Sequence, residues 1–89
     1  MNQLFTVYVL YSANFDKVYI GYTSNLINRF HSHNSLSTKG YTLKFRPWMV
    51  AYTEVYDSKS EAKQREKQLK SGQGRVFIWN YIERHKSKW

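Results

Sequence analysis

Residues 4–11 (LFTVYVLY) and 17–23 (KVYIGYT) decide the fold of this chain. Both segments are rich in β-branched and aromatic residues, which favour strands, and the turn formers SAN follow the first segment. The two segments therefore predict a β-hairpin. If its loop centres on residues 13–14, Tyr8 and Tyr19 lie directly opposite each other, with their side chains on one face of the sheet.

The segment after the hairpin predicts a helix at about residues 25–33. Either Thr23 or Ser24 can cap its N-terminus. Apolar residues recur in it at helical spacing and form a narrow stripe: Leu26, Ile27 and Phe30. Residues 34–44 (NSLSTKGYTLK) show no clear periodicity, and we expect them to form a surface loop.

The second half of the chain predicts one strand and two helices. Residues 48–56 (WMVAYTEVY) are expected to form a third strand, which begins directly after a proline. Ser58 and Glu61 have the spacing of a capping box, so a helix follows, and Gly72 is expected to end it.

A last helix is expected from residue 76 to about residue 85, because apolar and aromatic residues continue there without a turn signal. The tail at residues 86–89 is expected to fray. The chain, residues 1–89, is short enough for a single small domain, and the order of its elements predicts an α+β fold.

Charge and composition point to a polyanionic partner. Fourteen Lys and Arg against six Asp and Glu give a formal net charge of +8, which suits nucleic acid; an ordinary basic surface and an acidic protein partner are the alternatives. The absence of cysteine excludes a disulfide scaffold and a thiolate zinc site. No basic-then-apolar leader or long apolar stretch is present, so we expect a cytoplasmic protein with no membrane contact.

Glu66 is the most informative single residue. It shares one helix face with Ala62 and Leu69, so a carboxylate lies in a stripe that should be packed. An unpaired charge there would be costly, and Glu66 therefore needs a cation. Two interpretations remain open: an ion pair with a neighbour such as Arg65 or Lys70, or a bound metal ion.

Arg29 and His33 are four residues apart and are expected at the rim of the core, on the flank of the first helix. A guanidinium there suits a phosphate, and an imidazole can transfer a proton near neutral pH. The alternative is a solvated helix flank, and we expect His31 to lie at the surface. Tyr8 or Tyr19 can act as a general base only if nearby cations such as Arg29 favour the phenolate.

Gly21 lies within a strand, where a glycine marks a bulge or leaves room for a ligand; the bulge is the safer interpretation.

The acidic residues are too scattered for a two-metal site: Asp16, Glu54, Asp57, Glu61, Glu66 and Glu83. We expect one ion, held by Glu66 and waters, and such sparse ligation suits Mg²⁺.

The ordered series Tyr8, Tyr19-Ile20-Gly21, Arg29, His33-Asn34 and Glu66 resembles the GIY-YIG nuclease superfamily, in particular its short stand-alone bacterial members, called the UPF0213 or YhbQ-like group. The resemblance extends from about residue 4 to residue 82. Three further segments reinforce it: Gly40-Tyr41-Thr42, Arg46-Pro47 and residues 65–70 (REKQLK). The resemblance implies the GIY-YIG endonuclease fold, a small three-stranded antiparallel sheet flanked by helices in the order β-β-α-β-α-α.

The resemblance also implies a role for each matched residue. Glu66 matches the metal-ligand glutamate, and Arg29 matches the arginine that stabilises charge on the scissile phosphate. Tyr8 and Tyr19 match the paired motif tyrosines, either of which is assigned as the base in different relatives. His33 matches a histidine often found nearby; this residue or a water on the metal would assist the leaving oxygen.

These features predict a divalent-metal-dependent endonuclease that hydrolyses DNA phosphodiester bonds with one Mg²⁺ or Mn²⁺ ion. Its substrate would be branched, damaged or single-stranded DNA, with RNA left open, and its setting DNA repair. The alternative is a non-catalytic basic module of the same fold that binds nucleic acid. We expect a monomer or weak homodimer, with a protein partner for targeting as a further possibility. The expected phosphate contacts are Lys39, Lys44, Arg46, Lys63, Lys67, Lys70 and Arg75.

Overall fold

The computed structural model describes residues 3–36 and 40–89. Three strands and four α-helices follow the predicted order β-β-α-β-α-α, with one additional short helix, α2, before the third strand. The elements are β1 (Phe5–Ser12), β2 (Lys17–Thr23), α1 (Leu26–His31), the π-helical segment η1 (Ser32–Leu36), α2 (Tyr41–Lys44), β3 (Met49–Tyr56), α3 (Lys59–Lys70), α4 (Gly72–His85) and the 3₁₀ turn η2 (Lys86–Lys88).

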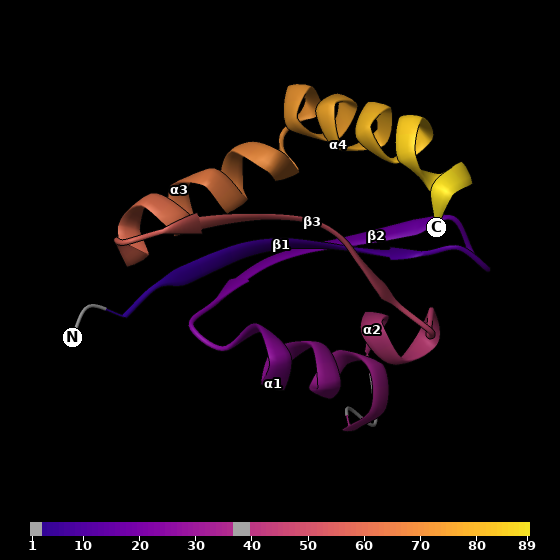
Figure 1. The fold of residues 1–89 in the computed structure, drawn as a ribbon, viewed down its shortest axis with the longest axis horizontal. Helices are drawn as coiled ribbons and strands as arrows, with labels where there is room; N and C mark the ends of the chain where they lie inside the picture. Colours follow the sequence, from indigo (N-terminus) through magenta and orange to yellow (C-terminus); the bar gives the residue numbers. More distant parts are fainter. Residues whose placement is uncertain (1–2, 37–39) are drawn as a thin grey trace.

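The three strands form one antiparallel sheet in the order β2-β1-β3. Helices α3 and α4 cover one face of the sheet, and α1 and α2 lie on the other (Figure 1). The central strand β1 is therefore buried on both faces, which explains why it is apolar or aromatic at nearly every position. The three-stranded antiparallel sheet flanked by helices confirms the predicted fold.

The two sides of β1 contribute to two separate cores. Val7, Val9 and Tyr11 pack towards α3 and α4 in one cluster of buried residues. Tyr8 and Leu10 pack on the opposite side with the buried Trp48 and with half-buried residues of α1. Alternation along the strand thus places Tyr8 on the face that carries α1.

The register of the hairpin differs from the expected one. Tyr8 pairs with Gly21, and Tyr19 pairs with Leu10, so the two tyrosines are not directly opposite. Strand β1 ends at Ser12 and β2 begins at Lys17, so the four-residue loop is centred on residues 14–15 rather than 13–14, and Asp16 in that loop has a positive φ of 54°. Because the offset between the tyrosines is two residues, they still share one face.

The bulge in this sheet lies in β3 and not at Gly21. Val9 pairs with Tyr52 while Leu10 pairs with Val50, so Ala51 is the extra residue. The β1–β2 ladder runs without a shift past Gly21, and the bulge interpretation of this glycine is wrong.

The region around α1 departs from the sequence-based prediction. The side chain of Asn25, rather than Thr23 or Ser24, caps α1 by accepting from the Asn28 backbone N–H at 3.1 Å. Ile27 is 84% exposed, so it does not belong to the apolar stripe. The chain continues beyond the helix as η1, and α2 lies inside the expected loop.

Tertiary contacts explain why this region is ordered. Arg46 donates from Nε to the His33 carbonyl at 2.8 Å and from Nη2 to the Ser32 carbonyl at 3.3 Å. The Asn34 side chain accepts from the Trp48 backbone N–H at 2.7 Å. These bonds join η1 to the start of β3, and a local reading of the sequence does not reveal them.

In the C-terminal half, Ser58 caps α3 as predicted, accepting from the Glu61 N–H at 3.3 Å. The helix ends one residue earlier than expected, and Ser71 both terminates α3 and caps α4, so α4 begins at Gly72. The tail is not frayed: it forms η2, and the Trp89 ring lies 6.0 Å from the ring of Tyr11.

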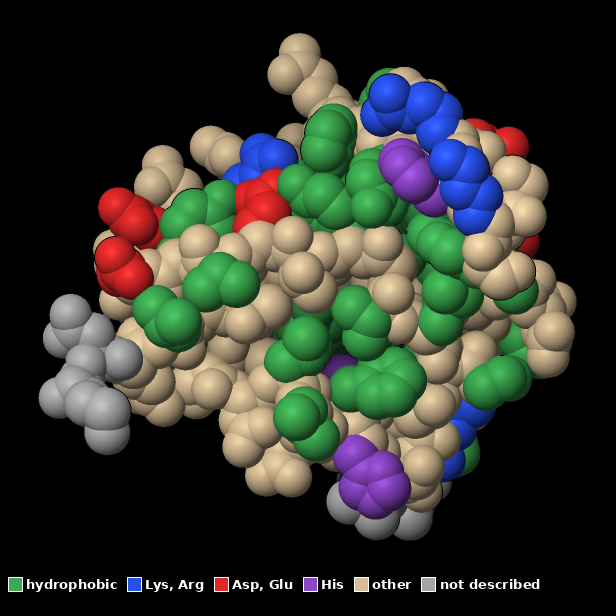
Figure 2. Space-filling view, viewed as in Figure 1, with side chains coloured by type: hydrophobic (Ala, Val, Ile, Leu, Met, Phe, Trp, Pro, Cys, Tyr) green, Lys and Arg blue, Asp and Glu red, His purple; other side chains and the backbone are tan. Residues whose placement is uncertain are grey.

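Basic and acidic side chains share one face of the molecule. Figure 2 shows basic side chains gathered over the C-terminal part of α4, whereas acidic side chains lie over the start of α3. The positive charge on this face is therefore not continuous. Within residues 3–36 and 40–89, no helix has the length and apolar character that crossing a membrane requires.

Candidate active site

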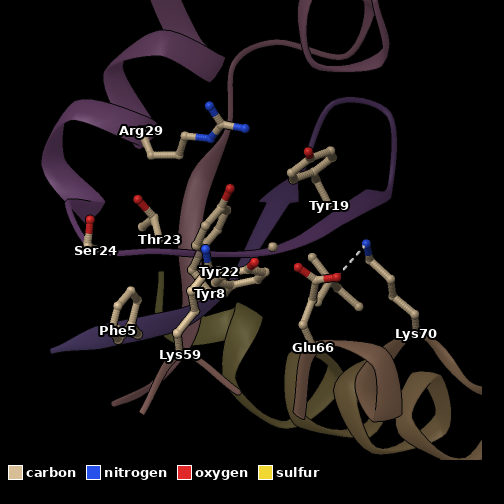
Figure 3. A pocket seen from close by; sticks show the side chains of 12 residues that line it. Phe5, Tyr8, Tyr19, Tyr22, Thr23, Ser24, Arg29, Lys59, Glu66 and Lys70 are labelled. Atoms are coloured by element: carbon tan, nitrogen blue, oxygen red, sulfur yellow. Dashed lines mark hydrogen bonds and ion pairs between the residues drawn. The ribbon is translucent and has the colours of Figure 1, made fainter. Parts of the chain in front are cut away.

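A cleft of about 440 Å³ opens beside β2, between α1 and α3 (Figure 3). Side chains from both strands of the hairpin and from both helices reach it. Its lining residues are Phe5, Tyr8, Tyr19, Ile20, Gly21, Tyr22, Thr23, Ser24, Arg29, Lys59, Glu66 and Lys70. Four of the five residues that the sequence predicted as catalytic are among them: Tyr8, Tyr19, Arg29 and Glu66.

The Tyr8 ring lies over Gly21 and leaves no room for a side chain at that position. A Cβ atom at residue 21 would stand 2.5 Å from the Tyr8 hydroxyl oxygen and 2.7 Å from its Cζ. No side chain larger than hydrogen fits there without moving Tyr8. The room left by this glycine is thus filled by the tyrosine of the neighbouring strand, directly across the ladder.

The Tyr8 hydroxyl forms a buried hydrogen bond of 2.9 Å with Nε2 of His33. Burial raises the pKa of Tyr8 to about 12, although the Arg29 guanidinium beside it acts in the opposite direction. Burial, together with the charges of Arg29 and Arg46, lowers the pKa of His33 below its ordinary value. Near neutral pH the pair is therefore a phenol and a neutral imidazole.

His33 differs in two ways from the prediction. It is buried, with 6% of its surface exposed, rather than placed at the rim, and it does not line the cleft. It lies behind the tyrosines, with its ring 4.6 Å from Tyr19 and 5.9 Å from Tyr8. Arg29 is exposed on the cleft side of α1, and His31 is exposed as expected.

Tyr19 is half-buried and stacks with Tyr8, with ring centroids 6.3 Å apart and planes at 25°. The predicted meeting of the two tyrosines therefore occurs, by a diagonal contact on one face of the hairpin. Since Tyr19 is the more exposed of the two, its hydroxyl is the more accessible to a ligand in the cleft.

Glu66 and Arg29 approach the cleft from opposite walls, Glu66 from α3 and Arg29 from α1 (Figure 3). The Glu66 side chain is 19% exposed and forms an ion pair with Lys70, with 3.0 Å between Glu66 Oε1 and Lys70 Nζ. Of the two interpretations that the sequence left open for Glu66, the ion pair is present, with Lys70 and not with Arg65. One carboxylate, Glu66, and three cations, Arg29, Lys59 and Lys70, therefore line one opening.

Arg65 has a different carboxylate partner. Its Nε and Nη2 donate to the two oxygens of Glu54 at 2.9 and 3.1 Å. Tyr52 and Tyr56 also donate to Glu54. Burial alone would raise the pKa of Glu54, but these hydrogen bonds hold it below its ordinary value. The network ties α3 to β3, and Glu54 stays out of the cleft.

The donor groups of the cleft fit one hydrated divalent ion. In the parts of the chain that the structure describes, no three Asp, Glu or His side chains converge as a metal cluster. Glu66 is the one carboxylate among the described cleft residues, alongside hydroxyls of Tyr, Thr and Ser. One hard oxygen ligand with water completing the shell is the kind of site that Mg²⁺ accepts, whereas a two-metal site does not fit.

The expected phosphate contacts are distributed unequally. Lys70 lines the cleft, and Arg75 lines a hollow beside it. Lys63 and Lys67 are exposed on α3. Lys44 lies over the Phe45 ring at 5.4 Å. Lys39 is outside the described residues.

Arg46 donates hydrogen bonds to the backbone carbonyls of His33 and Ser32 and so supports the fold; its contact with phosphate stays a prediction. Lys59 is a cleft residue that sequence reasoning missed. Its position seven residues before Glu66, on the same helix face, is the signal that could have identified it.

The family model that describes the GIY-YIG catalytic domain matches residues 4–87. The chain belongs to the GIY-YIG family. Its relatives include UPF0213 proteins. That of Natronomonas pharaonis is 42% identical over 65 residues, covering 73% of this chain and 75% of the relative. That of Staphylococcus haemolyticus is 39% identical over 56 residues, covering 63% and 68%.

A solved structure has the same fold as this GIY-YIG chain. The solution structure of the UPF0213 protein BH0048 from Bacillus halodurans superimposes with a TM-score of 0.52 at 26% sequence identity. The match covers 86% of this chain and 83% of that protein. The predicted membership of the UPF0213 group within the GIY-YIG family is confirmed.

Proposed function

We propose that this GIY-YIG domain is a divalent-metal-dependent endonuclease that hydrolyses DNA phosphodiester bonds in the cleft beside β2. One observation carries the proposal: Tyr8, Tyr19, Arg29 and Glu66 come from separate elements and line a single opening. Hydrolysis of a phosphodiester requires a proton acceptor for water and positive charge around the phosphate. The tyrosines can supply the proton acceptor, and Arg29 and an ion on Glu66 can supply the positive charge.

Glu66 would hold the ion, with water and a phosphate oxygen completing the shell. When bound, a Mg²⁺ or Mn²⁺ ion would supply positive charge that stabilises the pentavalent phosphate. Arg29 faces Glu66 across the cleft, so its guanidinium can bind the same phosphate in a planar two-point contact. Lys59 adds a cation at the same opening.

Tyr8 and His33 together provide a route for the proton of the attacking water. A free phenolate at Tyr8 is disfavoured at neutral pH by its pKa of about 12. The neutral His33 imidazole, 2.9 Å away, can accept the phenol proton while the Tyr8 oxygen accepts the proton from water. In this scheme His33 acts through Tyr8 and does not reach the leaving oxygen. Tyr19 orients the water or the phosphate from the exposed side of the pair.

The test is cleavage of end-labelled duplex, single-stranded, flap and branched DNA, with Mg²⁺, Mn²⁺ or EDTA. Wild type is compared with Glu66→Gln and with Glu83→Gln. Both substitutions remove one carboxylate that is paired with a lysine in the next helical turn, but Glu83 lies on α4 and does not line the cleft. We expect cleavage that requires metal, disappears in Glu66→Gln and survives in Glu83→Gln.

Two further variants examine the roles around the phosphate. Arg29→Ala and Tyr19→Phe should each lower the cleavage rate while leaving the thermal unfolding curve nearly unchanged, because Arg29 is exposed and Tyr19 is half-buried. Full activity in either variant would remove that residue from the scheme. Cleavage by Glu66→Gln at the wild-type rate would overturn the proposed metal site.

A second candidate function is a module that binds nucleic acid without cutting it. The Lys70 ammonium on Glu66 favours this alternative, because it already neutralises the carboxylate that would hold the metal. Binding of DNA by wild type with no product in Mg²⁺ or Mn²⁺ would support the module. Salt dependence would not separate the two functions, because both rely on phosphate contacts.

A further inference from the structure

A second hollow, of about 370 Å³, continues the cleft along β2. The two hollows share Tyr19, Ile20 and Lys70, and Val18, Tyr41 and Arg75 complete the lining of the second. Since β2 is an edge strand, both hollows lie along one open side of the sheet. Helices α1 and α2 lie on one side of this edge and α3 and α4 on the other (Figure 1). Together the hollows form a path that extends beyond the catalytic cleft.

Tyr19 and Tyr41 line this path, and Phe45 and Phe15 extend the series of rings beyond it. Tyr19 is 6.3 Å from Tyr41 between ring centroids, Tyr41 is 4.7 Å from Phe45, and Phe45 is 5.5 Å from Phe15. We call these four residues the aromatic row. Tyr41 is 44% exposed and Phe15 48% exposed, so two of the rings keep much of their surface in contact with solvent. Exposed apolar side chains that contact one another are typical of binding sites.

The exposed Tyr41 ring is held in place before any ligand arrives. The Tyr41 hydroxyl donates to the Val18 carbonyl at 3.1 Å, and its ring stacks on the buried Trp48 with centroids 5.8 Å apart and planes at 27°. A ring fixed in this way loses little conformational entropy on binding, which favours its use as a stacking surface.

Cations accompany the rings. Lys17 and Lys44 lie over the Phe45 ring, with Nζ at 5.5 and 5.4 Å from its centroid. Lys70 and Arg75 line the hollow that adjoins Tyr41. Aromatic faces interleaved with positive charge match single-stranded nucleic acid, because its unstacked bases can stack on the rings and its phosphates can pair with the cations. Paired bases in a duplex are stacked on each other and have no free faces for the rings.

We infer that the aromatic row and the second hollow bind unpaired nucleotides on one side of the scissile phosphate, and that the enzyme therefore requires single-stranded DNA there. The position relative to the scissile phosphate rests on the proposed nuclease function. The stacking itself does not, because it can be measured without cleavage.

The experiment measures binding in EDTA, where no metal-dependent cleavage occurs. The probes are a labelled single-stranded oligothymidine, the same oligomer with a run of abasic sites, and a duplex of equal length. Stacking of one base is worth about 1–3 kcal/mol, so the abasic oligomer should bind at least about 5-fold more weakly. The oligothymidine should also bind more tightly than the duplex.

Substitutions test whether the preference for normal over abasic oligomers comes from the aromatic row. Tyr41→Leu removes the flat ring while keeping an apolar side chain against Trp48, and should abolish most of the difference between the normal and abasic oligomers. Tyr41→Phe keeps the ring and should preserve the difference. Phe15→Leu tests an exposed loop position where folding is least affected, and Phe77→Leu, on α4 and outside both hollows, is the off-site control.

Each outcome decides a separate point. Equal binding of normal and abasic oligomers by wild type would overturn the inference, even if the protein cleaves DNA. An abasic effect that persists in both Tyr41→Leu and Phe15→Leu would overturn the assignment to the row. If base stacking depends on Tyr41 but the protein never cleaves DNA, the binding role of the aromatic row would be supported and the proposed nuclease function would be refuted.

Discussion

Gly21→Ala should disrupt the arrangement of side chains in the candidate active site through a single methyl group. The new Cβ would stand 2.5 Å from the Tyr8 hydroxyl oxygen, so the ring of Tyr8 must move away from β2. That movement strains the 2.9 Å hydrogen bond to His33 within a packed core. Overpacking of a core typically costs about 1–3 kcal/mol. For a domain of this size, about 2 kcal/mol corresponds to a fall in Tm of about 8–16 °C.

Thermal unfolding followed by circular dichroism measures this loss, and cleavage is then assayed at a temperature where the variant is folded. Gly72→Ala is the matched control, since a Cβ there meets nothing within 4 Å. It should leave Tm unchanged or slightly raised, because alanine restricts the unfolded chain more than glycine does. Gly21→Ala should lose cleavage as well as stability, whereas Gly72→Ala should lose neither.

A double-mutant cycle with Tyr8→Phe isolates the cause. The hydroxyl oxygen is the atom nearest to the new methyl group, so its removal should relieve part of the clash, and the two substitutions should cost less together than the sum of their separate costs. Unchanged Tm in Gly21→Ala, or strict additivity in the cycle, would refute the argument that this glycine is required by the Tyr8 ring.

Three further predictions follow from the same structure. Lys70→Met should lower the Mg²⁺ concentration for half-maximal cleavage by about 2-fold, because an (i, i+4) pair of this kind holds Glu66 with about 0.3–0.5 kcal/mol; an unchanged Mg²⁺ titration would show that the pair does not compete with metal. Because the pKa of His33 is lowered in the folded protein, the unfolded chain binds more protons than the folded chain just below pH 6.5. The free energy of unfolding should therefore fall as pH drops through that window. Urea titrations from pH 5 to 7.5 measure the slope of this free energy against pH, and His33→Gln should reduce that slope. Gly74→Ala should cost about 1–3 kcal/mol in urea unfolding, because its Cβ would lie 2.1 Å from the Gln68 carbonyl oxygen of the adjacent helix; wild-type stability would contradict that close contact.

Local signals in the sequence were sufficient for the three strands and for α3. The β-branched and aromatic runs predicted three strands, and the capping-box spacing of Ser58 and Glu61 predicted α3. These features depend on residues within a few positions of each other, so one sequence reveals them. The motif that indicated a GIY-YIG chain is different in kind, because it depends on the order of residues from Tyr8 to Glu66; the family model over residues 4–87 confirms it.

Contacts across space decided what local signals did not. The positive φ of Asp16 accompanies a four-residue loop and a register that sets Tyr8 against Gly21. Bonds from Arg46 order a segment that has no helical periodicity of its own.

The amino-acid sequence was enough to predict the strands, the capped helix α3, the excess of positive charge and the candidate residues Tyr8, Tyr19, Arg29 and Glu66. Only the folded structure shows that His33 is buried behind Tyr8, that Lys70 rather than Arg65 pairs with Glu66, and that the aromatic row begins at Tyr19 in the cleft. The physical reason is that composition and periodicity act over a few neighbouring residues. Burial, pairing and pKa depend instead on which side chains the whole fold brings together.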